Sequence, residues 1–395
     1  MILYILGFII LCILLFFMYI RLKYQFWAQQ PVFHFYDVYY WFYNKGIIMH
    51  KLPEKNRYIN FKSITVKEFD KLTNEDIKEL TLTIRLNYLR NKDNIYDPKQ
   101  ENIVPYFIGH NTKSYWSFYW QPELLLDNKT SKTIEINKLI GVMSSRPLHV
   151  KIIGKGELDV YYVDYLCVDK FYRKKNIAPQ IIQTHEYHQR HNNKNISVSL
   201  FKREEELTGI IPLTVYKIYC FNMRNWTTEP TLSPHIKLLT GDKQNMYYLY
   251  NFINENLKRW DIVIYPEISN LMELVATKNM YIKMLVVEGE IEAIYIFKKT
   301  CTYIEKGAEI LSCVCSINRN LSNEEFINGF KVSLWSLIKK ESSFKYLVIE
   351  NISENEKIIN NICIKTHPII ISPCAYFFYN FAYNSFNSRN CIIIN

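Results

Sequence analysis

Three basic side chains gather where an apolar stretch gives way to a helical pattern. Residues 165–168 (YLCV) are apolar enough for a strand, residues 178–179 begin a helical segment, and Arg173, Lys174 and Lys175 stand between them. A helix N-terminus presents free backbone N–H groups and partial positive charge, and basic side chains add charge-assisted hydrogen bonds. The junction therefore has the chemistry of a phosphate or pyrophosphate site, although a solvated basic turn would show the same residue types.

Asn176 stands where loops of this kind often use a glycine. Asparagine is the residue that, after glycine, most readily adopts the left-handed backbone conformation, because its short polar side chain can hydrogen-bond locally. We therefore predict that Asn176 replaces the missing glycine with a left-handed conformation at the start of the helix.

The elements that must position this loop occur twice along the chain. Alternating or helical patterns predict strands at 138–145, 158–168, 195–201 and 217–223 with a helix at 178–191, and then a hairpin at 284–297, strands at 309–317, 344–350 and 374–381, and a helix at 322–340. Ser322 and Glu325 form a capping-box pattern. A further helix is expected over residues 67–89. The sequence thus predicts an α/β protein with two similar halves, residues 21–225 and 226–395, joined through the polar segment 225–235.

The first twenty residues contain no charged side chain, and Arg21 and Lys23 follow at once. Twenty apolar residues in a helix can cross ~30 Å of hydrocarbon. A cleaved signal peptide would show a basic start, a shorter apolar region and a small-residue cleavage site. We predict an uncleaved single-pass anchor over residues 1–20, and the positive-inside rule places the remaining chain on the cytoplasmic side.

Composition argues against several classes of function. The net charge is +10, but long Lys/Arg tracts are absent, so no nucleic-acid partner is expected. The nine cysteines have no disulfide-framework spacing, which suits a reducing compartment. His185, His188 and His191 recur at every third position, but they do not form an H-E-x-x-H pattern. We interpret them as an exposed helix face and expect no metal site.

The segment YVDYLCVDKFYRKKNIAPQII (162–182) resembles the signature of glycylpeptide N-myristoyltransferases. Three more segments resemble that family in the same order, namely YQFWAQQPV (24–32), KLIGVMSSRP (138–147) and AYFFYNF (375–381). The resemblance covers nearly everything after residue 23. It implies two GNAT-like halves in tandem, forming one saddle-shaped mixed-sheet catalytic unit behind the transmembrane helix.

The resemblance also implies an activity. Members of the family transfer myristate from myristoyl-CoA to the N-terminal glycine amine of a protein, without a covalent enzyme intermediate. It implies myristoyl-CoA as a co-substrate, no permanently bound cofactor, Gly-initiated proteins or peptides as partners, and a monomer. Two backbone amides that stabilise the oxyanion map onto Tyr165 and Leu166, and the terminal carboxylate that acts as base maps onto Asn395.

Other roles carry over residue by residue. The residues matching the family's acyl-CoA contacts are Gln25, Phe26, Trp27, Tyr165, Leu166, Cys167, Val168, Arg173, Lys174, Lys175, Asn176, Ile177 and Ala178. The residues matching its peptide side are Tyr88, Tyr96, Asn222 and Asn351. The resemblance therefore assigns the CoA contacts mainly to the first half, and the peptide side and the catalytic C-terminus to the second half.

The chain departs from the family mainly on the peptide side. The family's acidic run is replaced by residues 89–92 (LRNK), Asp164 replaces an Asn, and Asn351 replaces an Asp. Two alternatives therefore stay open. One is a catalytically inactive membrane or virion component that retains the fold and binds acyl-CoA. The other is a GNAT-like enzyme that acylates a different amine.

Overall fold

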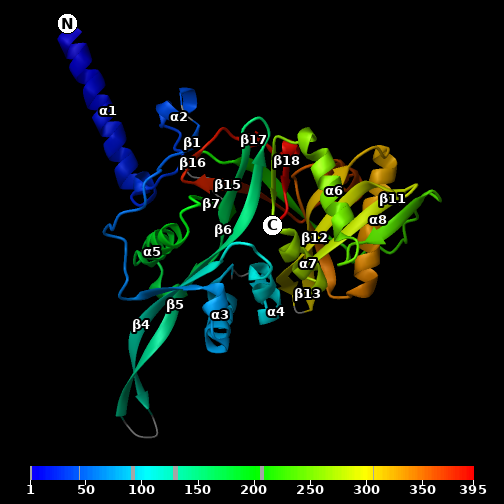
Figure 1. Ribbon diagram of the computed structural model, residues 1–395, viewed down its shortest axis with the longest axis horizontal. Coiled ribbons are helices and arrows are strands. Elements are labelled where there is room, and N and C mark those ends of the chain that lie inside the picture. The colour runs from blue at the N-terminus through cyan, green and yellow to red at the C-terminus, as the bar shows by residue number, and fades with distance from the viewer. Residues whose placement is uncertain (1, 44, 90–93, 128–131, 205–208, 306) are drawn as a thin grey trace.

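One continuous mixed sheet of sixteen strands runs through the molecule (Figure 1). The computed structural model describes residues 2–43, 45–89, 94–127, 132–204, 209–305 and 307–395. Along the main path the strand order is β18 (Cys391–Ile393), β10 (Ile262–Tyr265), β5 (Lys132–Ile152), β6 (Gly156–Val168), β7 (Val198–Glu204), β15 (Ile370–Tyr379), β8 (Thr214–Asn222), β14 (Phe344–Glu350), β13 (Ala308–Asn318), β12 (Glu290–Glu305), β11 (Met280–Val287) and β9 (Ile236–Thr240).

Shorter strands and helices complete the molecule. β4 (Tyr115–Asp127) pairs with β5 and β2 (Ile64–Glu68), β3 (Ile95–Tyr96) pairs with β12, β17 (Phe386–Asn387) pairs with β8, and β1 (Gly46–Ile47) pairs with β16 (Phe381–Ala382). The helices are α1 (Ile2–Tyr24), α2 (Val38–Phe42), α3 (Asn74–Asn87), α4 (Gln100–Ile103), α5 (Ile177–Asn192), α6 (Met246–Asn256), α7 (Ile268–Ala276), α8 (Asn323–Lys340) and α9 (Asn355–Cys363). The predicted α/β class is confirmed.

Strands of the two halves pair with each other at several places, including β10 with β5 and β3 with β12. β8 comes before residue 225 in the chain, yet it pairs with β14 of the second half. β15 belongs to the second half, yet it pairs with β7 of the first half as well as with β8. The two sets of strands are therefore interlocked at the centre of the sheet, rather than packed as two separate domains.

Local sequence explains where the helices begin. The Ser322–Glu325 capping box is present, and the stripe of Phe326, Phe330 and Leu334 is buried. The helix expected over 67–89 is shorter than predicted: α3 starts at Asn74, because Thr73 and Asp76 form the capping box that begins it. The residues before it end β2 and form a short turn.

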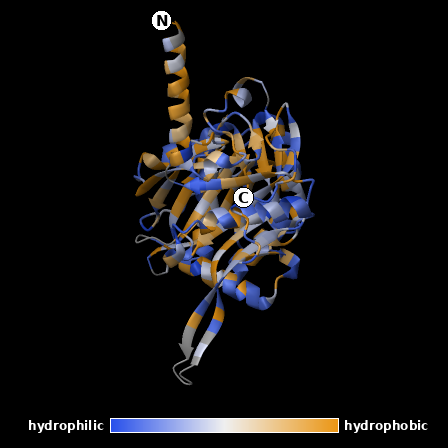
Figure 2. Cartoon of the chain, turned by 90° about the vertical axis from the view of Figure 1, so that its left-hand side faces the viewer, coloured by the Kyte–Doolittle hydropathy of each residue, from blue (hydrophilic) through white to orange (hydrophobic). Residues whose placement is uncertain are grey.

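Two elements leave the body of the protein, as Figures 1 and 2 show: α1 at one end and the β4–β5 hairpin at the other. α1 is apolar over most of its length (Figure 2) and almost none of it packs against protein. Within the described chain it is the one helix long and apolar enough to cross a membrane. Its 23 residues correspond to about 35 Å at ~1.5 Å per residue.

Candidate functional site

A β-bulge interrupts the pairing of β5 and β6 at Tyr165 and Leu166. Val142 lies opposite Cys167 and Ser144 lies opposite Asp164, so two residues of β6 oppose the single residue Met143. Tyr165 has a left-handed φ of 50°. Such bulges take backbone groups out of the ladder and are frequent beside active sites. The two residues matched to the family's oxyanion donors therefore form the bulge itself.

One of the two backbone N–H groups in this bulge already has a hydrogen-bond partner. The backbone N–H of Tyr165 donates a hydrogen bond to the carboxylate of the preceding residue, Asp164, at 2.9 Å. One of the two backbone N–H groups matched to the oxyanion donors is thus already hydrogen-bonded to a carboxylate. Before this amide can hold a developing oxyanion, the Asp164 side chain has to turn away.

Two cavities meet at this bulge. The first cavity has a volume of ≈ 460 Å³ and the second ≈ 450 Å³. Both are lined by Tyr88, Leu89, Tyr162, Asp164, Tyr165, Lys202 and Glu204. A molecule in the first cavity and a molecule in the second would therefore approach each other beside Tyr165.

The first cavity has an apolar wall and a polar end. Its wall includes Trp27, whose ring stacks on Phe201 with centroids 5.7 Å apart, together with Leu166 and Ile182. Trp27 follows α1 by three residues, so the matched segment 25–27 is brought to this cavity; Phe26 packs behind Trp27, and Gln25 is exposed. A long apolar chain could bury its surface along this wall.

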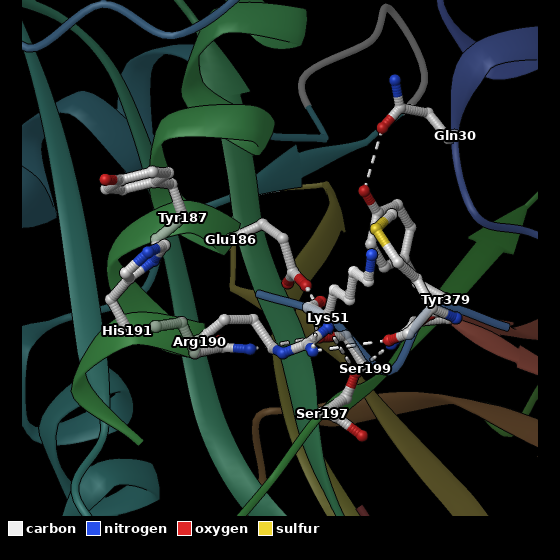
Figure 3. A network of polar contacts seen from close by, with 12 residues as sticks. Gln30, Lys51, Glu186, Tyr187, Arg190, His191, Ser197, Ser199 and Tyr379 are labelled. Carbon is white, nitrogen blue, oxygen red and sulfur yellow. Dashed lines mark hydrogen bonds and ion pairs between the residues drawn. The ribbon is translucent and has the colours of Figure 1, made fainter. Parts of the chain in front are cut away.

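The polar end is part of a buried network (Figure 3). Glu186, Ser199 and Tyr379 line the cavity there. The hydroxyl of Tyr379 donates to Gln30 at 2.9 Å. Glu186 lies 3.6 Å from Arg190 on the next turn of α5, and burial raises the pKa of Glu186 to about 7 in spite of this cation. The cavity therefore ends on a carboxyl that titrates near neutral pH.

The basic loop has the predicted backbone. Asn176 adopts φ 57° and ψ 24°, so the left-handed conformation at the start of α5 is confirmed. Arg173, Lys174 and Lys175 are all exposed, and Arg173 also donates to the backbone carbonyls of Val168 at 3.2 Å and Asn87 at 2.8 Å. Arg173 thus fixes the loop and, like Lys174 and Lys175, remains on its surface.

The other matched CoA residues lie beneath this loop. Val168 and Ile177 are buried together with Ile181, and Ala178 packs against them. Cys167 is also buried, and burial raises the pKa of its thiol to about 12. The thiol is therefore neutral, and this group of residues supports the loop by packing.

The second cavity is polar. Tyr96 lies in its wall with its hydroxyl 3.4 Å from that of Tyr165, and the ring of Tyr88 packs on both tyrosines. Lys202 forms a 3.0 Å ion pair with the buried carboxylate of Glu350. Of the two tyrosines that the resemblance assigned to the peptide side, Tyr88 thus lines both cavities and Tyr96 lines the second, next to Tyr165.

The C-terminus is an ordered part of the sheet. β18 pairs in parallel with β10, and all residues from Cys391 to Asn395 are buried. Lys298, in the wall of the second cavity, donates to a main-chain oxygen of Asn395 at 3.1 Å. The last residue of the chain is therefore held directly behind the cavity wall.

A buried arginine holds the side chain of the same residue. Arg146 is completely buried and donates from Nη2 to Oδ1 of Asn395. Its guanidinium lies 5.3 Å from the ring centroid of Tyr106 and 5.2 Å from that of Tyr162. Its Nε and Nη1 have no hydrogen-bond partner among the described residues. Among the described residues, Asn395 Oδ1 is thus the hydrogen-bond acceptor of the buried Arg146 guanidinium.

Burial and the nearby Arg146 lower the pKa of Lys298 to about 8. The carboxylates of Asp164 and Glu350 act in the opposite direction, because a neighbouring anion favours the charged ammonium. With a pKa of about 8, the Lys298 side chain is mostly protonated at neutral pH, and its ammonium donates to the main-chain oxygen of Asn395.

Asn222 and Asn351, the other two residues predicted for the peptide side, line neither of these two cavities. Asn222 lines a separate hollow of ≈ 730 Å³ with Trp226 and Trp335. Asn351 follows Glu350, but its backbone N–H donates to the carbonyl of Lys217. Residues 90–92 of the replaced acidic run lie outside the described residues. The structure thus brings together the tyrosines of the peptide side, not the two asparagines.

The prediction that His185 lies on an exposed helix face is wrong. The side chain is buried, with Nδ1 2.8 Å from the hydroxyl of Ser117 and Nε2 2.8 Å from that of Ser145. Burial lowers its pKa to about 3, so the ring is neutral. Two serine hydroxyls, which lie on β4 and β5, satisfy the ring and allow it to be buried.

The sequence analysis missed Arg146, Lys298, Lys202 and Glu350. A signal existed for Arg146, because it is a charged residue at the end of the apolar segment 138–147, which is otherwise suited to a buried strand. Lys298 and Glu350 also end or interrupt apolar strand patterns. Their partners are far away in the chain, so the pattern alone gives no pairing.

Comparisons with known proteins concern the family and the fold. Residues 51–213 match the model of the family described as "Myristoyl-CoA:protein N-myristoyltransferase, N-terminal domain". Among curated proteins, none matches the chain by sequence. Two structures of Saccharomyces cerevisiae N-myristoyltransferase with bound myristoyl-CoA are similar at 13% identity, with TM-scores of 0.67 and 0.69. These matches cover 93% and 92% of this chain, and 94% and 90% of the respective yeast chains.

A tandem GNAT protein from the clavulanic acid biosynthesis pathway is also similar, at 9% identity and a TM-score of 0.51. The match covers 82% of this chain and 100% of that one. At such low identity these structures establish the fold alone. They confirm the predicted tandem GNAT-like arrangement of the mixed sheet.

Proposed function

We propose that the chain is a member of the myristoyl-CoA:protein N-myristoyltransferase family, whose model matches residues 51–213, and that it transfers a myristoyl group from myristoyl-CoA to the N-terminal glycine amine of a protein. The observation that carries this proposal is the meeting of the two cavities at the Tyr165–Leu166 bulge, with the C-terminal residue held behind the wall of the second cavity.

In the proposed reaction the acyl chain occupies the first cavity and the peptide N-terminus occupies the second. The terminal carboxylate of Asn395 accepts a proton from the glycine ammonium. The free amine attacks the thioester carbon, and the carbonyl oxygen becomes an oxyanion next to the N–H groups of Tyr165 and Leu166. The C–S bond then breaks, the CoA thiolate leaves and takes up the proton that the attacking nitrogen loses, and an amide remains.

CoA itself would lie along the loop that precedes α5. The exposed Lys174 and Lys175 and the N-terminus of α5 supply positive charge for its phosphates. Arg173 supports the loop through the carbonyls of Val168 and Asn87 and also lines the second cavity. The phosphate grip therefore rests on two lysines and on backbone amides.

We further propose that α1 anchors the enzyme in a membrane with the catalytic region on the cytoplasmic side. Its length and exposed apolar surface support this, as do Arg21 and Lys23 directly at its end. Alkaline carbonate extraction of membranes from cells that express the full chain tests the anchor. An anchored protein stays in the membrane pellet.

One assay tests the activity. The purified full-length chain is mixed with labelled myristoyl-CoA and a panel of peptides that begin with glycine, alongside the same peptides beginning with alanine. Labelled product only from the glycine peptides is the expected result. Replacing myristoyl-CoA with acetyl-CoA tests the GNAT-like alternative, because the short acyl group leaves the apolar wall of the first cavity unused.

A second function is favoured by the contact between Asp164 and the Tyr165 amide. A carboxylate that occupied this amide permanently would oppose the oxyanion, and the protein would then bind acyl-CoA without turnover. In that case a non-hydrolysable myristoyl-CoA analogue binds, yet no peptide in the panel becomes labelled.

A further inference from the structure

A short aromatic segment beside α1 is largely exposed. Residues 35–43 read FYDVYYWFY and contain α2. Phe42 and Tyr43 are exposed to 78% and 82%. The other large exposed side chains of the segment are Phe35, Val38, Tyr39 and Trp41. Contiguous apolar patches on the surface of a soluble protein mark an interaction site.

This aromatic segment is a fixed part of the surface, not a loose connection. The carboxylate of Asp37 accepts the backbone N–H of His34 at 2.8 Å, and Trp41 Nε1 donates to the carbonyl of Phe35 at 3.1 Å. The buried ring of Phe33 packs on Trp41 with centroids 5.0 Å apart. The exposed rings are therefore held outward by a structured turn.

The aromatic segment contacts the apolar part of α1. Phe35 packs edge-on against Phe16, and Tyr36 packs edge-on against Phe17, each with centroids 6.4 Å apart. Phe16 and Phe17 come seven to eight residues before the end of α1 at Tyr24, or roughly 10–12 Å along a helix.

This contact fixes the depth of the segment. A helix that spans ~30 Å of hydrocarbon with its uncharged residues places Phe16 and Phe17 inside the bilayer, near the cytoplasmic boundary. The aromatic segment then lies at the same level. Trp and Tyr are enriched at this boundary, and peripheral apolar segments insert ~5–10 Å into it.

We propose that the aromatic segment 35–43 inserts into the same membrane leaflet from which α1 emerges, as a second and interfacial membrane contact. The inference rests on the proposed anchoring of α1. Arg21 and Lys23 at the end of α1 and Lys45 just after the segment supply positive charge at the level of the lipid phosphates.

The second contact has a consequence for the active site. A protein tethered by one helix is free to rotate about it, whereas two contacts fix one face toward the bilayer. Trp27, in the wall of the first cavity, lies in the sequence between α1 and the aromatic segment. The first cavity is therefore held near the membrane surface, where acyl chains and acylated products can partition.

The test uses full-length protein reconstituted into phosphatidylcholine vesicles whose acyl chains carry bromine near the headgroup or near the bilayer centre. Bromine quenches tryptophan only on contact. The emission of Trp41 is obtained as the difference between wild-type protein and Trp41→Phe. Trp335→Phe is the matched control, because Trp335 lies on α8 in the second half.

Loss of most of the Trp41 emission with the shallow bromine, together with unquenched Trp335 emission, supports the proposal. If carbonate does not extract the chain from these vesicles but Trp41 emission is unquenched, the interfacial contact is overturned. The proposed anchoring of α1 is then unaffected. A chain that carbonate extracts overturns both. Neither outcome depends on acyl-transfer activity.

Discussion

The guanidinium of Arg146 and the side-chain amide of Asn395 are hydrogen-bonded in the interior of the protein, 249 residues apart in the chain. The terminal residue is thus held at two points, since Lys298 contacts its main-chain oxygen. The family resemblance assigns a role only to the terminal carboxylate, as the base, so it places no requirement on the side chain of the last residue. We infer that in this chain the side chain helps to position the carboxylate proposed as the base.

The hydrogen bond between Arg146 and Asn395 predicts how single and double variants at these positions differ in stability. Asn395→Leu keeps the terminal carboxylate but leaves the buried guanidinium without its acceptor, which costs about 1.5–3 kcal/mol. We expect a lower free energy of unfolding and a lower kcat, with little change in KM for myristoyl-CoA. Arg146→Met combined with Asn395→Leu should regain much of the lost stability. A double variant no more stable than Asn395→Leu would contradict the pairing.

Moving the carboxylate should impair catalysis directly. One glycine added after Asn395 shifts the terminal carboxylate by a residue, and loss of a positioned general base costs about 10²-fold or more in kcat. Asn395→Gln is the matched control, because it keeps the chain length, the amide and the carboxylate. An extended enzyme with wild-type kcat would show that another group is the base.

Removing the charge next to Tyr165 should have the opposite effect. Asp164→Asn removes the anion beside the proposed oxyanion while preserving an acceptor for the Tyr165 N–H. Like charges at ~4 Å repel by several kcal/mol at an intermediate dielectric, so we expect kcat to rise by about tenfold or more. Glu204→Gln, at the same junction, is the control. A lower kcat in Asp164→Asn would indicate that the carboxylate binds the substrate amine.

Glu186 should make stability depend on pH. Its pKa is raised from its ordinary 4.5 to about 7, mainly by burial, with Arg190 on the same helix and Tyr379 of β15 as neighbours. The folded chain therefore binds more protons than the unfolded chain between these values. The stability contributed by neutral Glu186 is complete below about pH 4.5 and is lost as the pH rises through about 7.

Glu186→Gln cannot ionise, so its stability relative to wild type should increase between pH 5 and pH 8, by about 3 kcal/mol at most. Urea unfolding of both detergent-solubilised full-length proteins at the two pH values measures this difference. Glu75→Gln, at an exposed position on α3, should show no such trend. A pH-independent difference for Glu186→Gln would mean that Arg190 keeps the carboxylate ionised.

Much of the fold could be predicted from the sequence, because its signals are local. The apolar strand pattern at 158–168, the capping box at Ser322 and the left-handed conformation of Asn176 each depend on a few neighbouring residues. The start of α3 was misplaced because the polar residues before Asn74 are compatible with a helix, and only the Thr73 capping box ends that ambiguity.

The candidate site was less accessible, because its contacts join distant segments. The residues CIII at 391–394 are apolar, but nothing local predicts that they pair with β10. His185 looked exposed by spacing, yet hydroxyls from two strands satisfy it. Arg146, Lys298 and Asn395 come from three separate strands or strand ends, so only the folded chain brings their charges together.

The pairing of β8 and β15 with strands of the other half has a consequence for how the protein is made. During synthesis the first half leaves the ribosome with an unpaired edge on β7, because residues 370–379 that cover it are among the last to be translated. The central sheet can close only when the chain is nearly complete. Acyl-transfer competence would then arise after translation ends, in one late step that joins both halves and seats the terminal carboxylate.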